Sequence, residues 1–444
     1  MVNIIKKILK NKFFGNTSWL IFGRVAQMFI SFIISMITAR YLGPSNYGII
    51  SYVNSYISFF TAICNLGLNS VILKELVDRP DSEGETMGTI IGMRIISSVL
   101  SIVSIVTFIG ILFKDDRLYL TVALLQSLIL FFNSFEMIEY WYQSKLMSKR
   151  SAIAGIVAYI CMSLYRVVIL MLQKNVKWFA FATTLDNAVV AVLLTICYFK
   201  DGGQKLVFNK TLAKDILSRS HHFMWSSLMV AAYSEMNKIL LGSLIDETSV
   251  GYYSAAYSLC NTWPFILKAV IDSARPIIVE YHKTNHDMYI KRLRQLYATI
   301  FYMGSAVALM FTIFSPLIIK ILYGQQYLPS IMPLRIISWY TSFSYLGVAR
   351  STWMICEGKQ RYEKVLAGCG ALSNLILNFV FIPAYGAVGA AITTLLTQVL
   401  TNFLIPLCFK ETRQNSILIW EAICLKDVIP TKQEIKEILS NENS

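Results

Sequence analysis

Charged residues are scarce in this 444-residue chain: only 15% are Asp, Glu, Lys or Arg, against about 25% in an ordinary soluble domain. Hydrophobic residues reach 55%, and the mean hydropathy is +0.55. So few charges cannot cover the surface of a water-soluble fold of this size. The shortage therefore excludes a soluble enzyme, and the 13% of aromatic residues exclude a disordered chain.

Motifs for ATP binding and metal binding are missing as well. The pattern GxxxxGK[ST] is absent, so we expect no transport powered directly by ATP. None of the eight Cys residues forms a CxxC pair, and His282 and His286, four residues apart, lack a third ligand. We expect no metal, no cofactor beyond a coupling H⁺ or Na⁺, and no enzymatic activity.

What the sequence has in abundance is apolar blocks of about 20 residues, the length of a membrane-spanning helix. A β-barrel is excluded because runs such as Ile95–Leu112 do not alternate between polar and apolar residues. The sequence predicts an all-α integral membrane protein with about 12 transmembrane helices. The predicted spans are 18–39, 47–73, 87–113, 118–142, 151–173, 178–199, 222–245, 250–273, 295–319, 331–356, 365–383 and 387–409.

Basic residues are distributed unevenly between the two sides of these spans. Of the 40 Lys and Arg residues, 27 fall in the N-terminus, the even-numbered loops and the C-terminal tail, and 5 fall in the odd-numbered loops. By the positive-inside rule, both termini are cytoplasmic. The same bias accounts for most of the net charge of +14, so we expect no nucleic-acid partner.

A weak internal repeat divides the chain. A shift of 203 places Gly48 on Gly251, and a shift of 210 places 180–185 on 390–395. Because six spans is an even number, the two six-helix lobes would have the same orientation. The predicted parts are a basic N-terminus (1–17), an N-terminal lobe (18–199), a cytoplasmic linker (200–221), a C-terminal lobe (222–409) and a cytoplasmic amphipathic tail (410–444), whose Ile417, Leu418, Trp420 and Ile423 suit a membrane surface.

Polar stripes run along several spans at helical spacing, for example Arg24, Gln27, Ser31, Ser35 and Thr38 in the first. Such stripes fit helices around a hydrated central cavity. Packing of Ser and Thr at helix interfaces is the alternative for any single span.

Charged residues inside the spans are costly, so they persist when they pair or function. Arginine matches phosphate through its bidentate fork, which favours an anionic, phosphate-bearing substrate. Internal ion pairing, for example of Arg166 with Asp186, is the alternative. The candidate substrate-binding residues are Arg24, Gln27, Ser31, Asn54, Arg94, Arg166, Lys238, Arg335 and Arg350, and the candidate ion-coupling residues are Glu136, Asp186 and Glu235.

Five segments resemble polysaccharide repeat-unit flippases of the Wzx type, a branch of the multidrug/oligosaccharidyl-lipid/polysaccharide (MOP) exporter superfamily. They read TARYLGPSNYG (38–48), EYWYQ (139–143), KILLG (238–242), VGYYSAA (250–256) and NFVFIPAYGAVGAA (378–391). One position departs from the pattern: Asn237 stands where family members often carry an acid, which places ion coupling through that position in doubt.

The resemblance implies two six-helix lobes around a central cavity in a bacterial plasma (inner) membrane. It implies the flipping of an undecaprenyl-diphosphate-linked oligosaccharide for O-antigen, capsule or exopolysaccharide synthesis, with the bilayer, a polysaccharide polymerase and a chain-length regulator as partners. A cation-coupled drug antiporter of the same superfamily is the main alternative, although cations exceed acids inside the spans. A membrane enzyme would need a large outer loop, and an uncoupled scramblase stays open.

Overall fold

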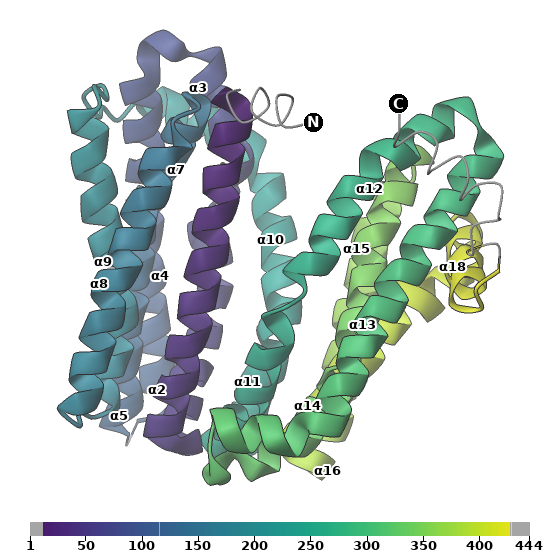
Figure 1. Ribbon diagram of the computed structural model, residues 1–444. Helices are drawn as coiled ribbons and strands as arrows, with labels where there is room; N and C mark the ends of the chain where they lie inside the picture. The colour runs from purple at the N-terminus through teal and green to yellow at the C-terminus, as the bar shows by residue number, and fades with distance from the viewer. Residues whose placement is uncertain (1–11, 115, 427, 429–444) are drawn as a thin grey trace, which may run out of the picture. The chain divides into compact units, whose positions relative to one another are not determined.

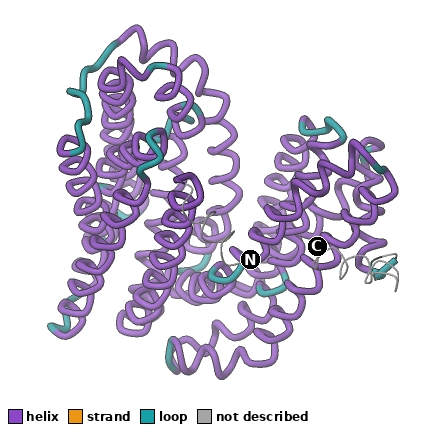
Figure 2. The backbone as a smooth tube through the Cα atoms, turned by 45° about the horizontal axis from the view of Figure 1, so that its top comes forward, coloured by secondary structure: helices purple, strands orange, loops and turns teal. Residues whose placement is uncertain are grey.

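The computed structural model describes residues 12–114, 116–426 and 428, and every regular element within them is a helix (Figures 1 and 2). The all-α prediction is therefore confirmed. The chain divides into two compact units, Met1–Gly251 and Tyr252–Ser444. This division lies beyond the predicted linker 200–221. The long helix Lys210–Leu244, which begins within that linker, groups with the first unit. The predicted lobe limits stay a prediction.

Within the described residues, six helical segments are long and apolar enough to cross a membrane, which indicates a multi-pass membrane protein. One of them, Arg361–Cys408, contains two predicted spans joined by a bend. The count of twelve spans and the cytoplasmic location of both termini stay predictions. The other five segments are Pro80–Leu112, Arg117–Ser144, Ser148–Met171, Val176–Lys200 and His286–Leu322.

The first unit is a bundle in which α8 and α9 lie side by side and α2 packs against α8 and α10 (Figure 1). Its helices are α2 (Lys12–Cys64), η1 (Leu68–Ser70), α3 (Ile72–Asp78), η2 (Pro80–Ser82), α4 (Glu83–Leu112), α5 (Arg117–Ser127), α6 (Ile129–Asn133), η3 (Ser134–Glu136), α7 (Met137–Ser144), α8 (Ser148–Met171), α9 (Val176–Lys200) and α10 (Lys210–Leu244), followed by the start of α11 (Glu247–Asn261).

Helix α2 consists of two helices joined by a sharp bend. Gly43 has a φ of 75°, a conformation that only glycine adopts readily, and Pro44 follows it. The bend falls between the predicted spans 18–39 and 47–73. It turns the polar stripes of the two halves of α2 toward one another, which matters for the site described below.

The predicted linker is not a free loop. Residues 201–209 form a strap that lies across a glycine face of α4, where a Cβ on Gly84 or Gly88 would collide with the backbone of the strap. The backbone N–H of Val207 donates to the carbonyl oxygen of Gly84 at 3.1 Å. Because the two glycines lack side chains, backbone can pack directly on helix, and the strap holds the beginning of α10 against the first unit.

The second unit contains the remaining helices. Helix α16 is bent at Gly386, which has a φ of 54°, three residues after Pro383. The predicted spans 365–383 and 387–409 meet at this bend. The elements are α12 (Phe265–Thr284), α13 (His286–Leu322), η4 (Gln325–Ser330), α14 (Ile331–Ile337), α15 (Tyr340–Cys356), α16 (Arg361–Val399), the π-helix η5 (Leu400–Leu404), α17 (Ile405–Cys408) and α18 (Lys410–Ile423).

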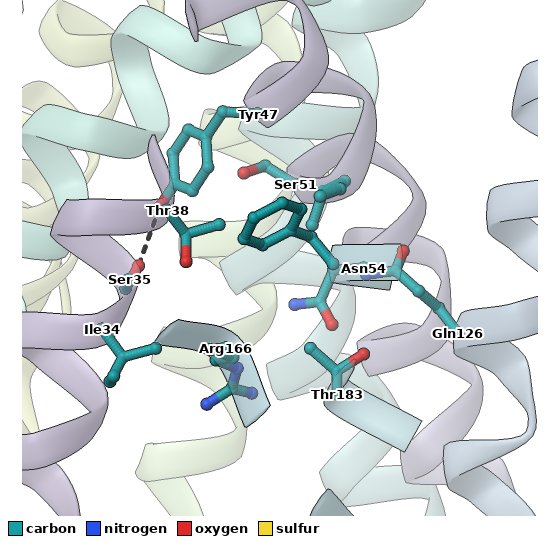
Figure 3. Close-up of a pocket in the computed structure, with 11 residues that line it drawn as sticks. Ile34, Ser35, Thr38, Tyr47, Ser51, Asn54, Gln126, Arg166 and Thr183 are labelled. Carbon is teal, nitrogen blue, oxygen red and sulfur yellow. Dashed lines mark hydrogen bonds between the residues drawn. The ribbon is translucent and has the colours of Figure 1, made fainter. Parts of the chain in front are cut away.

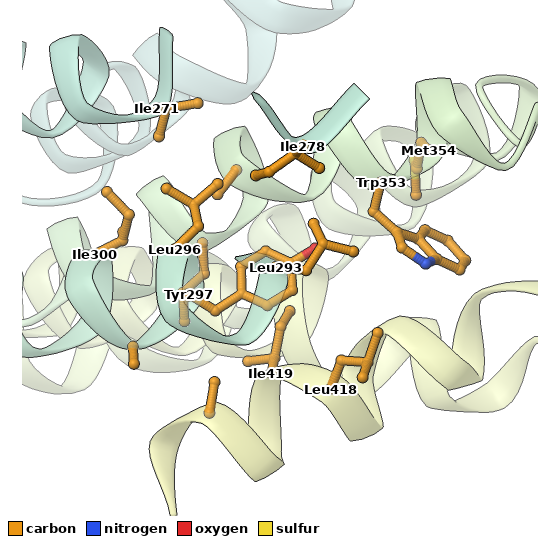
Figure 4. Close-up of a cluster of buried hydrophobic side chains, with 14 of the residues drawn as sticks. Ile271, Ile278, Leu293, Leu296, Tyr297, Ile300, Trp353, Met354, Leu418 and Ile419 are labelled. Atoms are coloured by element: carbon orange, nitrogen blue, oxygen red, sulfur yellow. The ribbon is translucent and has the colours of Figure 1, made fainter. Parts of the chain in front are cut away.

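The core of the second unit includes the tail helix α18 (Figure 4). Leu418 and Ile419 of α18 are buried with Leu296 and Tyr297 of α13. Trp420, by contrast, is 56% exposed. The amphipathic pattern of the tail therefore corresponds to a real helix. One of its apolar faces, however, packs on the protein rather than on a membrane surface.

Candidate functional site

The first unit contains a cavity of about 310 Å³ between helices α2, α5, α8 and α9 (Figure 3). Most of its lining side chains carry a hydroxyl or an amide, and one carries a guanidinium. The lining residues are Ile34, Ser35, Thr38, Tyr47, Ile50, Ser51, Asn54, Gln126, Arg166, Phe179 and Thr183.

Helix α2 supplies the polar wall because of its bend. Ser35 and Thr38 come from the first half of the helix, and Tyr47, Ser51 and Asn54 come from the second half. The hydroxyl groups of Ser35 and Tyr47 share a hydrogen bond of 3.2 Å, shown as a dashed line in Figure 3, which joins the two halves across the bend. Within each half of α2, the lining residues are three or four positions apart, which places each set on one face of its half of the helix.

Arg166 is the cation of the cavity, and it is already paired. Its Nη2 donates to Oδ2 of Asp186 at 2.8 Å, and the two side chains are 14% and 11% exposed. This confirms the ion pair that the sequence left as an alternative for these two residues. The other carboxylate oxygen of Asp186 is buried without a hydrogen-bond partner in the described part of the chain.

Arg94 lies outside the cavity and is almost completely buried, at 2% exposure. Its Nη2 donates to Oδ1 of Asn65, and its guanidinium interacts electrostatically with Glu136. Its Nε and Nη1 have no hydrogen-bond partner among the residues described here. Arg94 therefore sits in the bundle between helices, with two donors to spare.

Lys238 and Glu235 form a third association of a cation with an acid. The two side chains lie three residues apart on α10, and Nζ of Lys238 donates to Oε2 of Glu235 at 2.8 Å. Each of the three acids predicted to couple ions thus lies beside a cation predicted to bind substrate. The oppositely charged neighbour reduces the free-energy cost of burying each of these charges.

The two candidate arginines of the second unit contact protein groups. Nε of Arg335 donates to the Ser315 hydroxyl at 2.9 Å. Arg350 is 6% exposed, and its Nη1 donates to the carbonyl oxygens of Thr401 and Asn402 at 3.2 and 3.4 Å. These two carbonyls belong to the π-helix η5, where the widened turn leaves them available.

Three candidates cannot be placed at the level of side chains. Arg24, Gln27 and Ser31 belong to helix α2, but their side chains lie outside the described residues. Among the residues that the structure describes, no group of three or more His, Cys, Asp and Glu could hold a metal ion.

Of the eleven lining residues, only Asn54 and Arg166 were named as site candidates, while Ser35 and Thr38 belonged to a predicted polar stripe. The lining residues outside both sets include Tyr47, Gln126, Phe179 and Thr183. A signal existed for two of them. Gln126 is an uncharged amide inside the apolar run 118–142, and Thr183 belongs to the repeated segment 180–185. Tyr47 and Phe179 carry no such signal, because aromatic residues are common throughout the spans.

Comparison with known proteins gives a family. The family described as "Polysaccharide biosynthesis protein" matches residues 13–282, more than half of the chain. A relative from Escherichia coli (strain K12), named "Putative O-antigen transporter", is 21% identical over 386 residues, which cover 86% of this chain and 92% of the relative. These matches confirm the resemblance drawn from the five sequence segments.

Two solved structures share the fold. An inward-facing MATE-family multidrug resistance transporter of the MOP superfamily has a TM-score of 0.63 at 15% identity, covering 89% of this chain and 96% of its own. The lipid II flippase MurJ, in an inward closed conformation, has a TM-score of 0.62 at 14% identity, covering 96% and 95%. The chain therefore belongs to the polysaccharide biosynthesis protein family, and its fold is that of the MOP-superfamily transporters.

Proposed function

We propose that this chain is a flippase that moves an undecaprenyl-diphosphate-linked oligosaccharide from the cytoplasmic to the outer leaflet of a bacterial plasma membrane. The observation that carries the proposal is the cavity of the first unit, where hydroxyl and amide side chains share the wall with Arg166. Sugar hydroxyls are bound through many such donors and acceptors, and a guanidinium suits an anion. The family description and the name of the Escherichia coli relative support a role in polysaccharide synthesis.

Within this proposal, Asn54, Ser51 and Gln126 contact the sugar. Arg24 and Arg94 are the proposed ligands of the diphosphate. Arg94 lies outside the cavity, so this contact would form in another state of the transport cycle, and its Nε and Nη1, which have no partner among the described residues, support the assignment. Arg350 already donates to two backbone carbonyls, so we propose that it stabilises its own turn instead. The polyprenyl tail stays in the lipid, and alternating access moves the head group. A polymerase and a chain-length regulator would act on the product.

Coupling to H⁺ or Na⁺ would act through the pair of Arg166 and Asp186. An anionic group of the substrate that approaches Arg166 competes with Asp186 for the same guanidinium. The displaced carboxylate is then the group that binds the coupling cation. Asp186 Oδ1, buried and without a hydrogen-bond partner among the described residues, supports this assignment.

A cation-coupled drug antiporter is the second candidate, because a MATE transporter shares the fold and a fold alone does not determine function. Such a protein would present an acid to its cationic substrate. None of the eleven lining residues that the structure describes is an acid, and Asp186, the partner of the lining residue Arg166, is neutralised by it at 2.8 Å. The pair therefore offers no free acid to a cationic substrate, and the hydroxyl and amide side chains of the wall suit a sugar.

Deletion of the gene in its host, followed by extraction of lipid-linked sugars and a sidedness assay, tests the proposal. We expect repeat units to accumulate on the cytoplasmic face and surface glycan to disappear. Complementation with Asn54→Ala should restore surface glycan only in part, whereas Asn187→Ala, outside the cavity on α9, should restore it fully. Unchanged lipid-linked sugars together with increased sensitivity to cationic drugs would favour the antiporter.

A further inference from the structure

A second cavity, of about 500 Å³, lies in the other unit between helices α12 and α13, which contact one another (Figure 1). The function proposed above does not use it. We call it the α12–α13 groove, and its lining residues are Val270, Ala274, Ile277, Ile278, Tyr281, Arg292, Gln295, Leu296 and Thr299.

The groove has an apolar wall of the right length for an acyl chain. Val270, Ala274, Ile277 and Tyr281 follow one another at spacings of four, three and four residues, which places them on one face of α12. At 1.5 Å per residue, the wall from Val270 to Tyr281 is about 16 Å long. Ile277 is 49% exposed, so the wall is open to a ligand from outside the protein.

The polar end of the groove lies at the α12–α13 hairpin. The guanidinium carbon of Arg292 is 5.9 Å from the centroid of the Tyr281 ring, which places the cation at one end of the apolar wall. Helix α13 runs back from the hairpin, so Gln295 and then Thr299 follow Arg292 toward the Val270 end. The groove is therefore positively charged at the hairpin end and lined by aliphatic side chains toward the other end.

Arg292 lacks an anionic partner in the part of the chain that the structure describes. Its Nη1 donates to Oε1 of Gln295 at 2.9 Å, and its Nε is buried without a hydrogen-bond partner. Asp287 is exposed in the first turn of α13, and Glu421 is already held by Arg294 at 2.6 Å. The segment 274–294 carries five Lys and Arg residues and only two acids. An external anion would satisfy the charge.

We propose that the α12–α13 groove binds an anionic phospholipid of the surrounding leaflet, with the phosphodiester against Arg292 and one acyl chain along Val270, Ala274 and Ile277. A basic hairpin beside an apolar wall matches the two parts of such a lipid, and basic pockets between membrane helices attract anionic head groups. The bound lipid would contact α12 and α13 at the same time. This site is separate from the cavity of the first unit, so the proposal stands or falls independently of the transported substrate.

The test uses the full chain, purified in a non-ionic detergent. Binding of phosphatidylglycerol is measured by native mass spectrometry, and the thermal unfolding midpoint is measured with and without the same lipid. We expect phosphatidylglycerol to bind and to raise the midpoint, and phosphatidylcholine with identical acyl chains to do so much less. Arg292→Gln should bind phosphatidylglycerol about tenfold more weakly, the change expected from the loss of one charged hydrogen bond.

Two matched variants distinguish binding in the groove from nonspecific electrostatic attraction of the lipid to the protein. Lys283→Gln removes one charge from the exposed last turn of α12, outside the groove, and should bind phosphatidylglycerol as the unaltered chain does. Ile277→Gln changes an exposed residue of the apolar wall, so the fold should persist while lipid binding weakens. If Arg292→Gln does not fold, Arg292→Lys replaces it in the same measurements, because this variant keeps the charge and removes only the guanidinium.

Four results would overturn the proposal. Equal losses in Arg292→Gln and Lys283→Gln would mean attraction without a site. Equal binding of phosphatidylcholine would mean that the head group is not recognised. An equal rise of the midpoint with inorganic phosphate would mean an anion site without a lipid. Unchanged binding in Ile277→Gln would mean that the acyl chain lies elsewhere.

Discussion

The backbones at Gly48 and Gly251 lie against one another. Gly48 contacts Glu247, four residues before Gly251, and Gly251 in turn contacts Pro44, four residues before Gly48. A Cβ on Gly48 would collide with the carbonyl oxygen of Glu247, and a Cβ on Gly251 would collide with the carbonyl oxygen of Pro44. The sequence repeat relates the same residues, because a shift of 203 places Gly48 on Gly251 and Pro44 on Glu247. A contact that is reciprocal in this way is expected where a local two-fold axis passes between two related hairpins.

Alanine at either glycine should disturb this contact. Gly48→Ala or Gly251→Ala forces two backbones apart, and overpacking of this kind costs about 1–3 kcal/mol. Gly368→Ala is the matched control, because this glycine also lies in a helix and a Cβ there meets nothing within 4 Å. Thermal unfolding of the purified variants measures the difference. Equal stability of all three variants would contradict a tight contact at Gly48 and Gly251.

Part of the polar wall of the cavity could be predicted from the sequence. Asn54 and Arg166 were predicted and lie in the cavity, and its Ser35 and Thr38 belong to the polar stripe predicted in the first span. The reason is that a polar residue in a membrane helix stands out against its apolar neighbours. Tyr47 was not predicted, because its position depends on the bend at Gly43, which folds one half of α2 back on the other.

Removal of one partner from the Arg166–Asp186 pair should lower the stability of the protein more than removal of both partners. Arg166→Gln leaves a carboxylate buried without its cation, which costs about 3–5 kcal/mol. Addition of Asp186→Asn removes that charge and should recover most of the stability. Unfolding midpoints of the two single variants and the double variant give the coupling between the residues.

Transport measured on the same three variants separates stability from substrate binding. If Arg166 also contacts the substrate, the double variant will be stable and will still fail to restore surface glycan in the deletion strain. Full restoration by the double variant would leave Arg166 with a structural role alone.

Arg350 should matter for stability rather than for binding. Arg350→Gln removes the donor from the carbonyl oxygens of Thr401 and Asn402, and buried acceptors without partners cost about 1–3 kcal/mol. We expect a lower unfolding midpoint and a smaller amount of protein in the membrane, with surface glycan reduced in proportion to that amount. Normal stability with lost glycan would instead support the sequence-based assignment of Arg350 to the substrate.

Packing between distant segments is the part of the fold that the sequence did not reveal. The strap 201–209 has the composition of a loop, yet it lies on the glycine face of α4. Helix α18 has the amphipathic pattern of a surface helix, yet Leu418 and Ile419 are buried in the second unit. In both cases the local pattern indicates that one face is covered, but it does not identify the covering surface, because that surface is far away in the chain.

The attachment of α18 should depend on pH through Glu421. This carboxylate accepts from Nζ of Lys426 at 2.7 Å and from Nη2 of Arg294 at 2.6 Å. The hydrogen bond from Lys426, followed by that from Arg294, lowers the pKa of Glu421 below its usual value, against the opposing effect of burial. The folded-state pKa is therefore below that of the unfolded chain, which is about 4.3.

The sign follows from this difference. The stabilisation is fully present above about pH 4.3, and it is lost as the pH falls through the lower folded-state value, where the carboxylate takes up a proton. Hydrogen exchange of the α18 amides between pH 7 and pH 3, corrected for the intrinsic pH dependence of exchange, should show weaker protection at the acidic end.

Glu421→Gln should show weaker protection already at pH 7 and a flatter dependence on pH, since the amide cannot ionise. Lys426→Met removes one of the two cations and should give an intermediate result. A pH dependence in Glu421→Gln as steep as that of the unaltered chain would assign the effect to another carboxylate. Burial of Leu418 and Ile419 would then be sufficient to hold α18 on α13 without the ion pair.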